Sequence, residues 1–222
     1  MKFTFGIITA DFVLPQVIDS IKNQNIPEYE IVIVGGRNIY ENSNINYIPF
    51  NESSGKYTSK KNTITKNAKY ENIVFMHDYY ILEDGWYKGF LEFGDDWDIC
   101  MNIIKNKDGS RFRDWCAYDD PKINFPGGAQ PTQTRPIITD PNHRLMLPRY
   151  DYDKTHYMYI SGGYWISKKY VMEEEPLNEN LDWAESEDVE WSKRVLPKYA
   201  YIMNIRSSVR TLKDKRLSAE YV

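Results

Sequence analysis

Polar residues and glycines follow four apolar segments of this chain, where side chains and exposed backbone could contact a ligand. The four junctions are Thr9-Ala10-Asp11, Gly35-Gly36-Arg37, His77-Asp78-Tyr79 and Ser161-Gly162-Gly163. In an open α/β sheet, ligands bind beyond the carboxyl ends of the strands. Each junction is weak evidence by itself, because such residues also form ordinary turns. Together, the junctions predict one binding crevice.

A second candidate is the acidic pair Glu187 and Asp188, which opens a predicted helix. A carboxylate at a loop-to-helix junction projects from a rigid base and can accept a proton from a reacting hydroxyl. Acidic residues in a first helical turn also complement the helix dipole, without any catalytic role. Taken alone, the pair is compatible with both interpretations.

The elements that must position these residues alternate between strand and helix patterns. Apolar runs predict strands over residues 3–9, 30–34, 47–50, 72–76, 97–103, 157–160 and 199–205. Helices are predicted after Asp11, with Pro15 in the first turn, and over residues 57–68, 84–93, 167–175 and 186–196. This alternation predicts an α/β fold, in which helices flank a central, mostly parallel sheet. The period-two pattern of residues 97–103 is typical of a half-exposed, antiparallel strand.

Composition narrows the class of protein. The chain has 222 residues and a net charge of −4, which favours one domain over residues 1–222 and argues against a nucleic-acid partner. No apolar run approaches the roughly 20 residues of a membrane helix, so no integral membrane segment is expected. With two cysteines, Cys100 and Cys116, and no secretion signal, we expect a cytoplasmic location. The 18 Tyr, 9 Phe and 6 Trp residues could present aromatic faces to sugars or build an aromatic core.

Two segments lack a regular pattern. Residues 117–149 are rich in Pro, Gly, Asp and Asn and are too long for an ordinary connection, so we expect an active-site loop there. Residues 206–222 form a stretch that is basic up to Arg216. This stretch is either a charged tail or a lid whose cations meet a leaving diphosphate.

The order of these motifs resembles glycosyltransferase family 2 and its relatives with the GT-A fold. Glu30-Ile31-Val32-Ile33-Val34 is similar to that family's second strand. Lys60-Lys61-Asn62, ahead of residues 73–78, resembles its block of Arg-Asn, helix, strand and Asp-x-Asp. Ser161-Gly162-Gly163, followed by residues 183–188, resembles its late block of Gly-Gly and Glu-Asp. The resemblance covers most of the chain except about residues 105–155, and implies a Rossmann-like nucleotide-diphospho-sugar transferase fold.

The resemblance also implies a function. A hexosyltransferase-like enzyme would move a sugar from a nucleotide-diphosphate sugar, by default a UDP-sugar, to an acceptor hydroxyl with inversion. The expected partners are this nucleotide-sugar donor and a glycan, lipid-linked or protein acceptor. Donor binding is assigned to Thr9, Ala10, Asp11, Gly35, Lys60, Asn62, His77, Asp78 and Tyr79. Acceptor binding is assigned to Gly162, Gly163, Trp165 and Trp183, and the catalytic base to Asp188, with Glu187 next.

Two departures from the family pattern affect the donor site. His77-Asp78-Tyr79 stands where the family has Asp-x-Asp, which holds a divalent cation that neutralises the leaving diphosphate. We therefore expect Asp78 to hold Mn²⁺ or Mg²⁺, with His77 or His156 as a helper, because Mg²⁺ often takes only one or two carboxylates. Gly35-Gly36 stands where the family usually has an Asp that touches the nucleoside, so base recognition is expected to differ.

Other interpretations remain open. Asp78 could cap a turn, Trp165 and Trp183 could belong to the core, and the lysines after residue 59 could be solvated on a polar helix. A sugar-1-phosphate nucleotidyltransferase would need a Gly-rich basic loop where this chain has Thr9-Ala10-Asp11-Phe12. A non-catalytic GT-A domain that binds a nucleotide or glycan is the alternative from another class, because the second Asp of the metal motif is missing.

Overall fold

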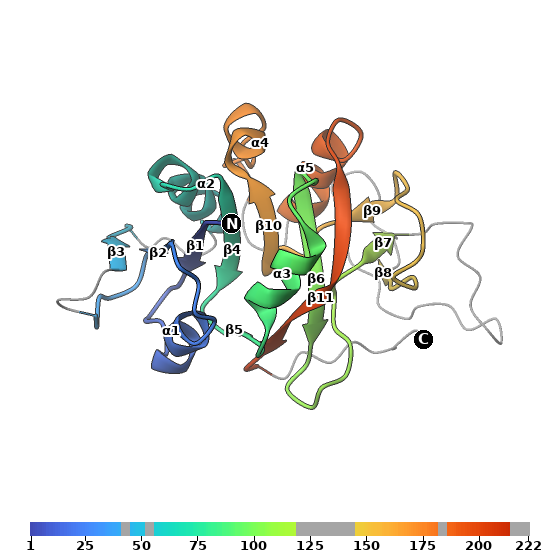
Figure 1. Ribbon diagram of the computed structural model, residues 1–222. Helices are drawn as coiled ribbons and strands as arrows, with labels where there is room; N and C mark the ends of the chain where they lie inside the picture. The colour runs from blue at the N-terminus through green and yellow to red at the C-terminus, as the bar shows by residue number, and fades with distance from the viewer. Residues whose placement is uncertain (41–44, 52–55, 119–144, 182–185, 214–222) are drawn as a thin grey trace.

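A computed structural model describes residues 1–40, 45–51, 56–118, 145–181 and 186–213. These residues form an eight-stranded sheet, a three-stranded sheet and five helices (Figure 1). The strand order in the large sheet is β3-β2-β1-β4-β10-β6-β11-β5. Helices flank this mixed, mostly parallel sheet, as the sequence predicted.

The first half of the large sheet is a parallel, doubly wound unit. It comprises β1 (Phe3–Ile8), α1 (Pro15–Lys22), β2 (Tyr29–Val34), β3 (Ile45–Ile48), α2 (Tyr57–Asn67) and β4 (Asn72–His77). Strand β1 pairs in parallel with β2 on one side and with β4 on the other. Because all four strands run in the same direction, their carboxyl ends meet at one edge, where three of the predicted junctions begin.

The second half of the large sheet is mixed. It comprises β5 (Tyr80–Leu82), α3 (Trp86–Phe93), β6 (Ile99–Lys105), β10 (Tyr164–Lys168), α4 (Lys169–Glu174), α5 (Glu187–Val195) and β11 (Tyr201–Thr211). Strand β10 runs antiparallel to β4 and to β6, whereas β11 runs parallel to β6. The prediction for residues 97–103 was therefore half right, because β6 has one antiparallel and one parallel neighbour and is mostly buried.

A small antiparallel sheet stands beyond the second half. Strand β7 (Cys116–Tyr118) pairs with β8 (Leu145–Met146) and with β9 (Met158–Tyr159). Figure 1 shows this sheet on the side of β6 and β11, away from β3. The ends of the predicted loop 117–149 thus belong to two strands, and residues 119–144 lie outside the described part of the chain.

Opposite faces of the large sheet are covered by α2 and α3. Side chains alternate between the faces of a strand. Phe3 of β1 packs edge-on against Trp86 of α3, with ring centroids 5.1 Å apart. Gly6 faces the other way, and a Cβ there would lie 2.3 Å from Ile64 of α2. The glycine in β1 therefore lets α2 approach the sheet closely.

The end of the chain corrects one prediction. We expected the last strand to stop at residue 205, but β11 continues to Thr211 across an irregularity between Asn204 and Ser208. Arg206 and Arg210, expected in the basic tail or lid of residues 206–222, belong to this strand and pair with Glu92 and Glu83. Residues 214–222 lie outside the described part.

Candidate active site

Backbone and side-chain contacts join all four predicted junctions at one edge of the sheet. The Thr9 hydroxyl donates to Asp78 Oδ2 at 2.6 Å, which links the ends of β1 and β4. The Arg37 amide donates to the Asp11 carbonyl at 2.6 Å, which links the ends of β1 and β2. The His77 amide donates to the Gly163 carbonyl at 3.0 Å.

Ser161-Gly162-Gly163 reaches this edge by a route that the sequence did not indicate. We expected these residues to follow a strand of the main sheet. They instead precede β10, after the short strand β9 of the small sheet. Because β10 is antiparallel to β4, its amino end lies beside the carboxyl end of β4, where Tyr164 is paired with Met76.

On the predicted donor side, Asp78 presents a partly exposed carboxylate that accepts the Thr9 hydrogen bond. Beside it, the Tyr79 hydroxyl lies 3.0 Å from His77 Nδ1. Burial raises the pKa of Tyr79 well above its ordinary value, so this phenol stays protonated at neutral pH. A carboxylate, an imidazole and a neutral hydroxyl therefore meet at the end of β4.

The turns after β1 and β2 provide the outer part of this side. Ala10 and Asp11 are exposed, and Asp11 Oδ1 pairs with Arg37 Nε at 3.1 Å. Gly35 and Gly36 have φ angles of 91° and 64°, in the left-handed region that glycine favours. A Cβ on Gly36 would lie 2.2 Å from the Asp11 carbonyl oxygen. These glycines therefore bring the two turns into contact.

Lys60 and Lys61 of α2 are buried, which rules out the solvated interpretation. Their exposed fractions are 2% and 1%. Lys60 Nζ donates to the Thr9 carbonyl at 2.7 Å. Lys61 Nζ donates to the Gly162 carbonyl at 2.8 Å and pairs with Glu187 Oε1 at 3.2 Å. The two lysines of α2 therefore fix the backbone at Thr9 and at Gly162.

Glu187 and Asp188 lie directly against Gly162. The Gly162 amide donates to Asp188 Oδ2 at 3.0 Å, and the Val189 amide donates to Oδ1 at 2.9 Å. A Cβ on Gly162 would lie 2.9 Å from Asp188 Oδ2 and 3.1 Å from Glu187 Oε1. The missing side chain of Gly162 thus makes room for the protein's own carboxylates.

The two adjacent carboxyls differ in their surroundings. Burial and the charge of Glu187 raise the pKa of Asp188 to about 6, although Lys61 and Arg113 oppose this shift. Glu187 has Lys61 as a direct ion-pair partner, whereas Asp188 accepts hydrogen bonds from backbone amides. Asp188 can therefore exchange a proton close to neutral pH, which suits a general base.

Trp165, expected at the acceptor site, belongs to the core. Its side chain is fully buried, and its ring stacks on Phe75 with centroids 4.6 Å apart. Lys61 Nζ lies 4.8 Å from the Trp165 ring centroid. Trp165 therefore supports the buried lysine instead of stacking on a ligand. Trp183, the other tryptophan of this prediction, lies outside the described residues.

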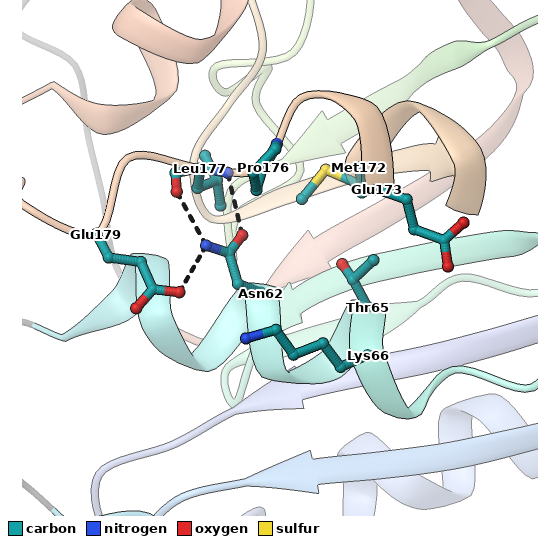
Figure 2. A pocket seen from close by; sticks show the side chains of 8 residues that line it. All are labelled: Asn62, Thr65, Lys66, Met172, Glu173, Pro176, Leu177 and Glu179. Carbon is teal, nitrogen blue, oxygen red and sulfur yellow. Dashed lines mark hydrogen bonds between the residues drawn. The ribbon is translucent and has the colours of Figure 1, made fainter.

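Asn62 contacts the segment that follows α4. Figure 2 shows its amide bonded to Leu177 and Glu179. The same side chain lines a cavity of about 390 Å³, whose other lining residues are Thr65, Lys66, Met172, Glu173, Pro176, Leu177 and Glu179. The donor-binding prediction for Asn62 gains no support, because its amide anchors the segment after α4.

The metal prediction rests on Asp78. Within the described residues, no three His, Cys, Asp or Glu side chains are grouped as a metal site. His156 is exposed just before β9, where its ring packs on Tyr157 with centroids 4.0 Å apart. A cation at Asp78 would therefore take most of its remaining ligands from a bound diphosphate and from water.

Two residues near the Gly162-Gly163 segment were missed by sequence reasoning. Tyr80 is almost fully buried, and its hydroxyl would lie 2.9 Å from a Cβ on Gly163. Arg113 follows β6, and its charge acts on both Tyr80 and Asp188. No motif in the sequence marks either residue. Only the pairing of β7 with β9 brings this arginine toward the Gly-Gly segment.

Comparisons with known proteins identify the fold of the chain but not its activity. No protein-family model matches the chain, and no curated protein sequence matches it. Solved structures of GT-A glycosyltransferases match the whole chain. The likeness is in structure and not in sequence, because the identities are low.

The matched structures include TarS of S. aureus and GalNAc-T7. TarS residues 1–349 with UDP-GlcNAc superpose with a TM-score of 0.63 at 15% identity, covering 100% of this chain and 62% of the other. GalNAc-T7 with UDP, GalNAc and Mn²⁺ superposes with a TM-score of 0.65 at 12% identity, covering 98% of this chain and 44% of the other. The chain thus has the GT-A fold, and it spans less than two thirds of these proteins.

Proposed function

We propose that this GT-A domain transfers a hexosyl group from a nucleotide-diphosphate sugar, by default a UDP-sugar, to an acceptor hydroxyl with inversion. One observation carries the proposal. Asp78 and Asp188 flank the same Gly162-Gly163 segment, which bonds to His77 on one side and to Asp188 on the other. One carboxylate is thus available beside a leaving diphosphate and a second beside an attacking hydroxyl.

The donor side would bind the nucleotide diphosphate through the ends of β1, β2 and β4. The cation that Asp78 would hold, Mn²⁺ or Mg²⁺, supplies charge neutralisation for the leaving diphosphate. Asp78 is suited to this role because its carboxylate is partly exposed at the strand end and is oriented by Thr9. The UDP-GlcNAc bound in TarS, and the UDP and Mn²⁺ bound in GalNAc-T7, support this donor class.

On the acceptor side, Asp188 would take the proton of the acceptor hydroxyl as its oxygen attacks the anomeric carbon. The bond from that carbon to the diphosphate oxygen breaks in the same step, and the electron pair leaves with the diphosphate. The Gly162 and Val189 amides fix the Asp188 carboxylate in orientation. Lys61 compensates the charge of Glu187. The Glu187 carboxylate therefore opposes the ionisation of Asp188 less strongly than an unpaired carboxylate would.

A glycan, a lipid-linked sugar or a protein could offer the acceptor hydroxyl. In the described residues, no helix is long and apolar enough to span a membrane. Both cysteines are buried free thiols, which supports a cytoplasmic location as part of the proposal. Fractionation of cells that express the native chain would test this location.

A non-catalytic GT-A domain is the second candidate. The observation in its favour is the lone carboxylate at the end of β4, without a grouped metal site in the described part. Hydrolysis of the donor separates the two candidates. An enzyme should release sugar from UDP-GlcNAc or another UDP-hexose in the presence of Mn²⁺, and a binding domain should not.

The decisive assay follows UDP release from a panel of UDP-hexoses with Mn²⁺ or with excess chelator. We expect turnover with at least one donor, and its loss in Asp78→Asn. Glu28→Gln is the matched control, because Glu28 is an exposed partner of Lys2 at the opposite edge of the sheet. Nucleotide binding without any turnover would favour the non-catalytic candidate.

A further inference from the structure

Arg113 differs from the other arginines in the described part of the chain, because each of those has a carboxylate partner. The pairs are Arg37–Asp11, Arg111–Asp114, Arg149–Asp151, Arg194–Glu175, Arg206–Glu92 and Arg210–Glu83. Among the described residues Arg113 forms no ion pair, although Asp114 is its neighbour in sequence. No described carboxylate therefore competes with a ligand anion for its guanidinium.

Asp114 is unavailable because other groups occupy its carboxylate. It accepts from Arg111 Nε at 2.8 Å, from the Trp115 amide at 2.6 Å and from the Tyr150 hydroxyl at 2.7 Å. Arg113 is only partly exposed, and its Nε is buried with no hydrogen-bond partner in the described part of the chain. A buried polar group without a partner costs free energy, and such a group in a folded protein needs an explanation.

The fold places Arg113 near the Gly162-Gly163 segment. It lies three residues before Cys116 of β7, which is paired with Tyr159 of β9, and Gly162 follows soon after β9. The charge of Arg113 lowers the pKa of Asp188 and of Tyr80. Arg113 therefore lies close enough to the proposed base to influence it.

We propose that Arg113 binds an oxyanion carried by the acceptor, a phosphate or a carboxylate, so that the enzyme selects acidic acceptors over neutral ones. The planar guanidinium matches such groups with two parallel hydrogen bonds. This inference rests on the proposed function, because it names the chemistry of the acceptor for that same site.

Binding of the anion would also prepare the base. Burial and Glu187 raise the pKa of Asp188, while the charge of Arg113 lowers it. An oxyanion on Arg113 would neutralise that charge, so Asp188 would become a stronger proton acceptor once the acceptor is bound. Acidic acceptors would then have a higher kcat as well as a lower KM than neutral ones.

The first experiment compares matched acceptors with the full chain and its UDP-hexose donor. Methyl glucoside, methyl glucoside 6-phosphate and methyl glucuronoside differ only at the sixth carbon. We expect kcat/KM for one or both acidic acceptors to exceed that for the neutral one by about 10–100-fold, the value of a charge-assisted hydrogen bond. The two acidic compounds distinguish phosphate from carboxylate as the natural group.

Variants at this position test whether Arg113 is responsible. Arg113→Gln should reduce the preference to less than about threefold while the donor Kd stays unchanged, and Arg113→Lys should keep part of the preference. Arg206→Gln is the control, because it removes an exposed arginine of β11. Equal use of all three acceptors by the unmodified enzyme would overturn the proposal. Equal loss of hydrolysis and transfer in Arg113→Gln would overturn it too, since it would assign the arginine to the donor.

A binding measurement keeps this test separate from that of the proposed function. Inorganic phosphate and methyl glucuronoside are titrated against the unmodified chain and Arg113→Gln, and the thermal midpoint is followed. Stabilisation that disappears in Arg113→Gln but persists in Asp78→Asn supports the anion site, even if no donor is turned over. Absence of stabilisation by both probes overturns it. Removing an unpaired cation should not lower the midpoint of the free protein, so a folding defect would be recognised.

Discussion

Two adjacent carboxyls, Glu187 and Asp188, receive different environments from neighbouring elements. Lys61 of α2 pairs with Glu187, and the Gly162 amide before β10 binds Asp188. A buried carboxyl whose pKa is raised toward neutrality, as that of Asp188 is, is typical of a general base. At the residue scale, the candidate site therefore depends on contacts between groups that are far apart in the sequence.

Replacing Asp188 tests the assignment of the base. Asp188→Asn keeps the size and most of the hydrogen-bonding shape but removes the proton acceptor. We expect kcat for transfer to fall by about 10²–10⁴-fold while the donor Kd stays nearly constant. Glu187→Gln serves as the neighbouring comparison, measured in the same assay. A collapse of kcat in Glu187→Gln alone would move the role to that residue, and normal turnover in both would contradict the inverting mechanism.

The raised pKa of Asp188 also predicts a pH dependence. Since burial and Glu187 bring it to about 6, kcat/KM for transfer should rise with pH and level off above about pH 7. Stability should change in the opposite sense. Between about pH 4 and 6 the folded state keeps a proton that the unfolded chain has released, so this carboxyl contributes less stability as pH rises through that window.

Transfer rates and urea unfolding between pH 4 and 8 would check both trends, with Asp188→Asn as the comparison. The variant should lose the acidic limb of the rate profile and the matching slope in unfolding free energy. An acidic limb that persists unchanged in Asp188→Asn would assign the titration to another group.

At the scale of elements, the sequence predicted the parallel half well and the mixed half poorly. Strands β1, β2 and β4 are buried apolar runs with clear ends, which a sequence pattern records. Strand β10 is short, buried on both faces and followed at once by α4. Its sequence therefore lacks the alternation of apolar and polar residues that would distinguish it from the helix. The irregularity in β11 interrupts its pattern in the same way.

Helix α2 shows why the site was only partly predictable. Its sequence is polar, which suggests a solvated surface, yet Thr58, Lys60, Lys61, Asn62 and Thr65 are all buried. Each lysine is matched by an acceptor from a distant segment, and such matches leave no periodic signal in a single sequence. Asp78 and Asp188 were identified through resemblance and their place at element ends, whereas Arg113 offered no signal at all.

The contact between α2 and α5 gives a prediction about stability. Lys61→Met removes the cation that compensates Glu187 and satisfies the Gly162 carbonyl. We expect the free energy of unfolding to fall by about 1–3 kcal/mol, because a largely buried carboxylate and a carbonyl lose their partner. Urea denaturation measures this change, and Lys88→Met, at an exposed lysine paired with Glu92 in α3, should stay within about 0.5 kcal/mol of the parent.

A double variant sharpens the test. Lys61→Met combined with Glu187→Gln should recover part of the loss, because no buried charge then remains without compensation. If the single variant is as stable as the parent, the buried ion pair does not hold α5 against the Gly-Gly segment. If the double variant is no more stable than Lys61→Met, the loss comes from packing and not from charge.

At the scale of the whole molecule, the candidate site lies where the direction of the strands in the sheet changes. Strands β3, β2, β1 and β4 are parallel, and the next strand, β10, is antiparallel. The carboxyl end of β4 and the amino end of β10 therefore meet at one edge. The first half contributes Asp78 there, and the second half contributes Gly162 and Gly163, with Asp188 and Arg113 behind them. Under the proposed function, the donor and the acceptor would approach from different halves of the sheet.

Ligand binding to the donor half should stabilise the whole domain. A ligand at about 100 times its Kd contributes about 2.7 kcal/mol of stability, which corresponds to about 5–10 °C in Tm for a domain of this size. We expect UDP with Mn²⁺ to produce a shift of this order, UDP with excess chelator to produce little, and Asp78→Asn to abolish the metal-dependent part. Differential scanning fluorimetry measures these shifts, with Glu28→Gln as a control that should respond like the parent. The metal prediction fails if chelator leaves the UDP shift intact, or if Asp78→Asn responds to Mn²⁺ as the parent does. A larger shift with GDP than with UDP would leave the metal prediction standing but would indicate a guanosine nucleotide, and not a uridine nucleotide, as the donor.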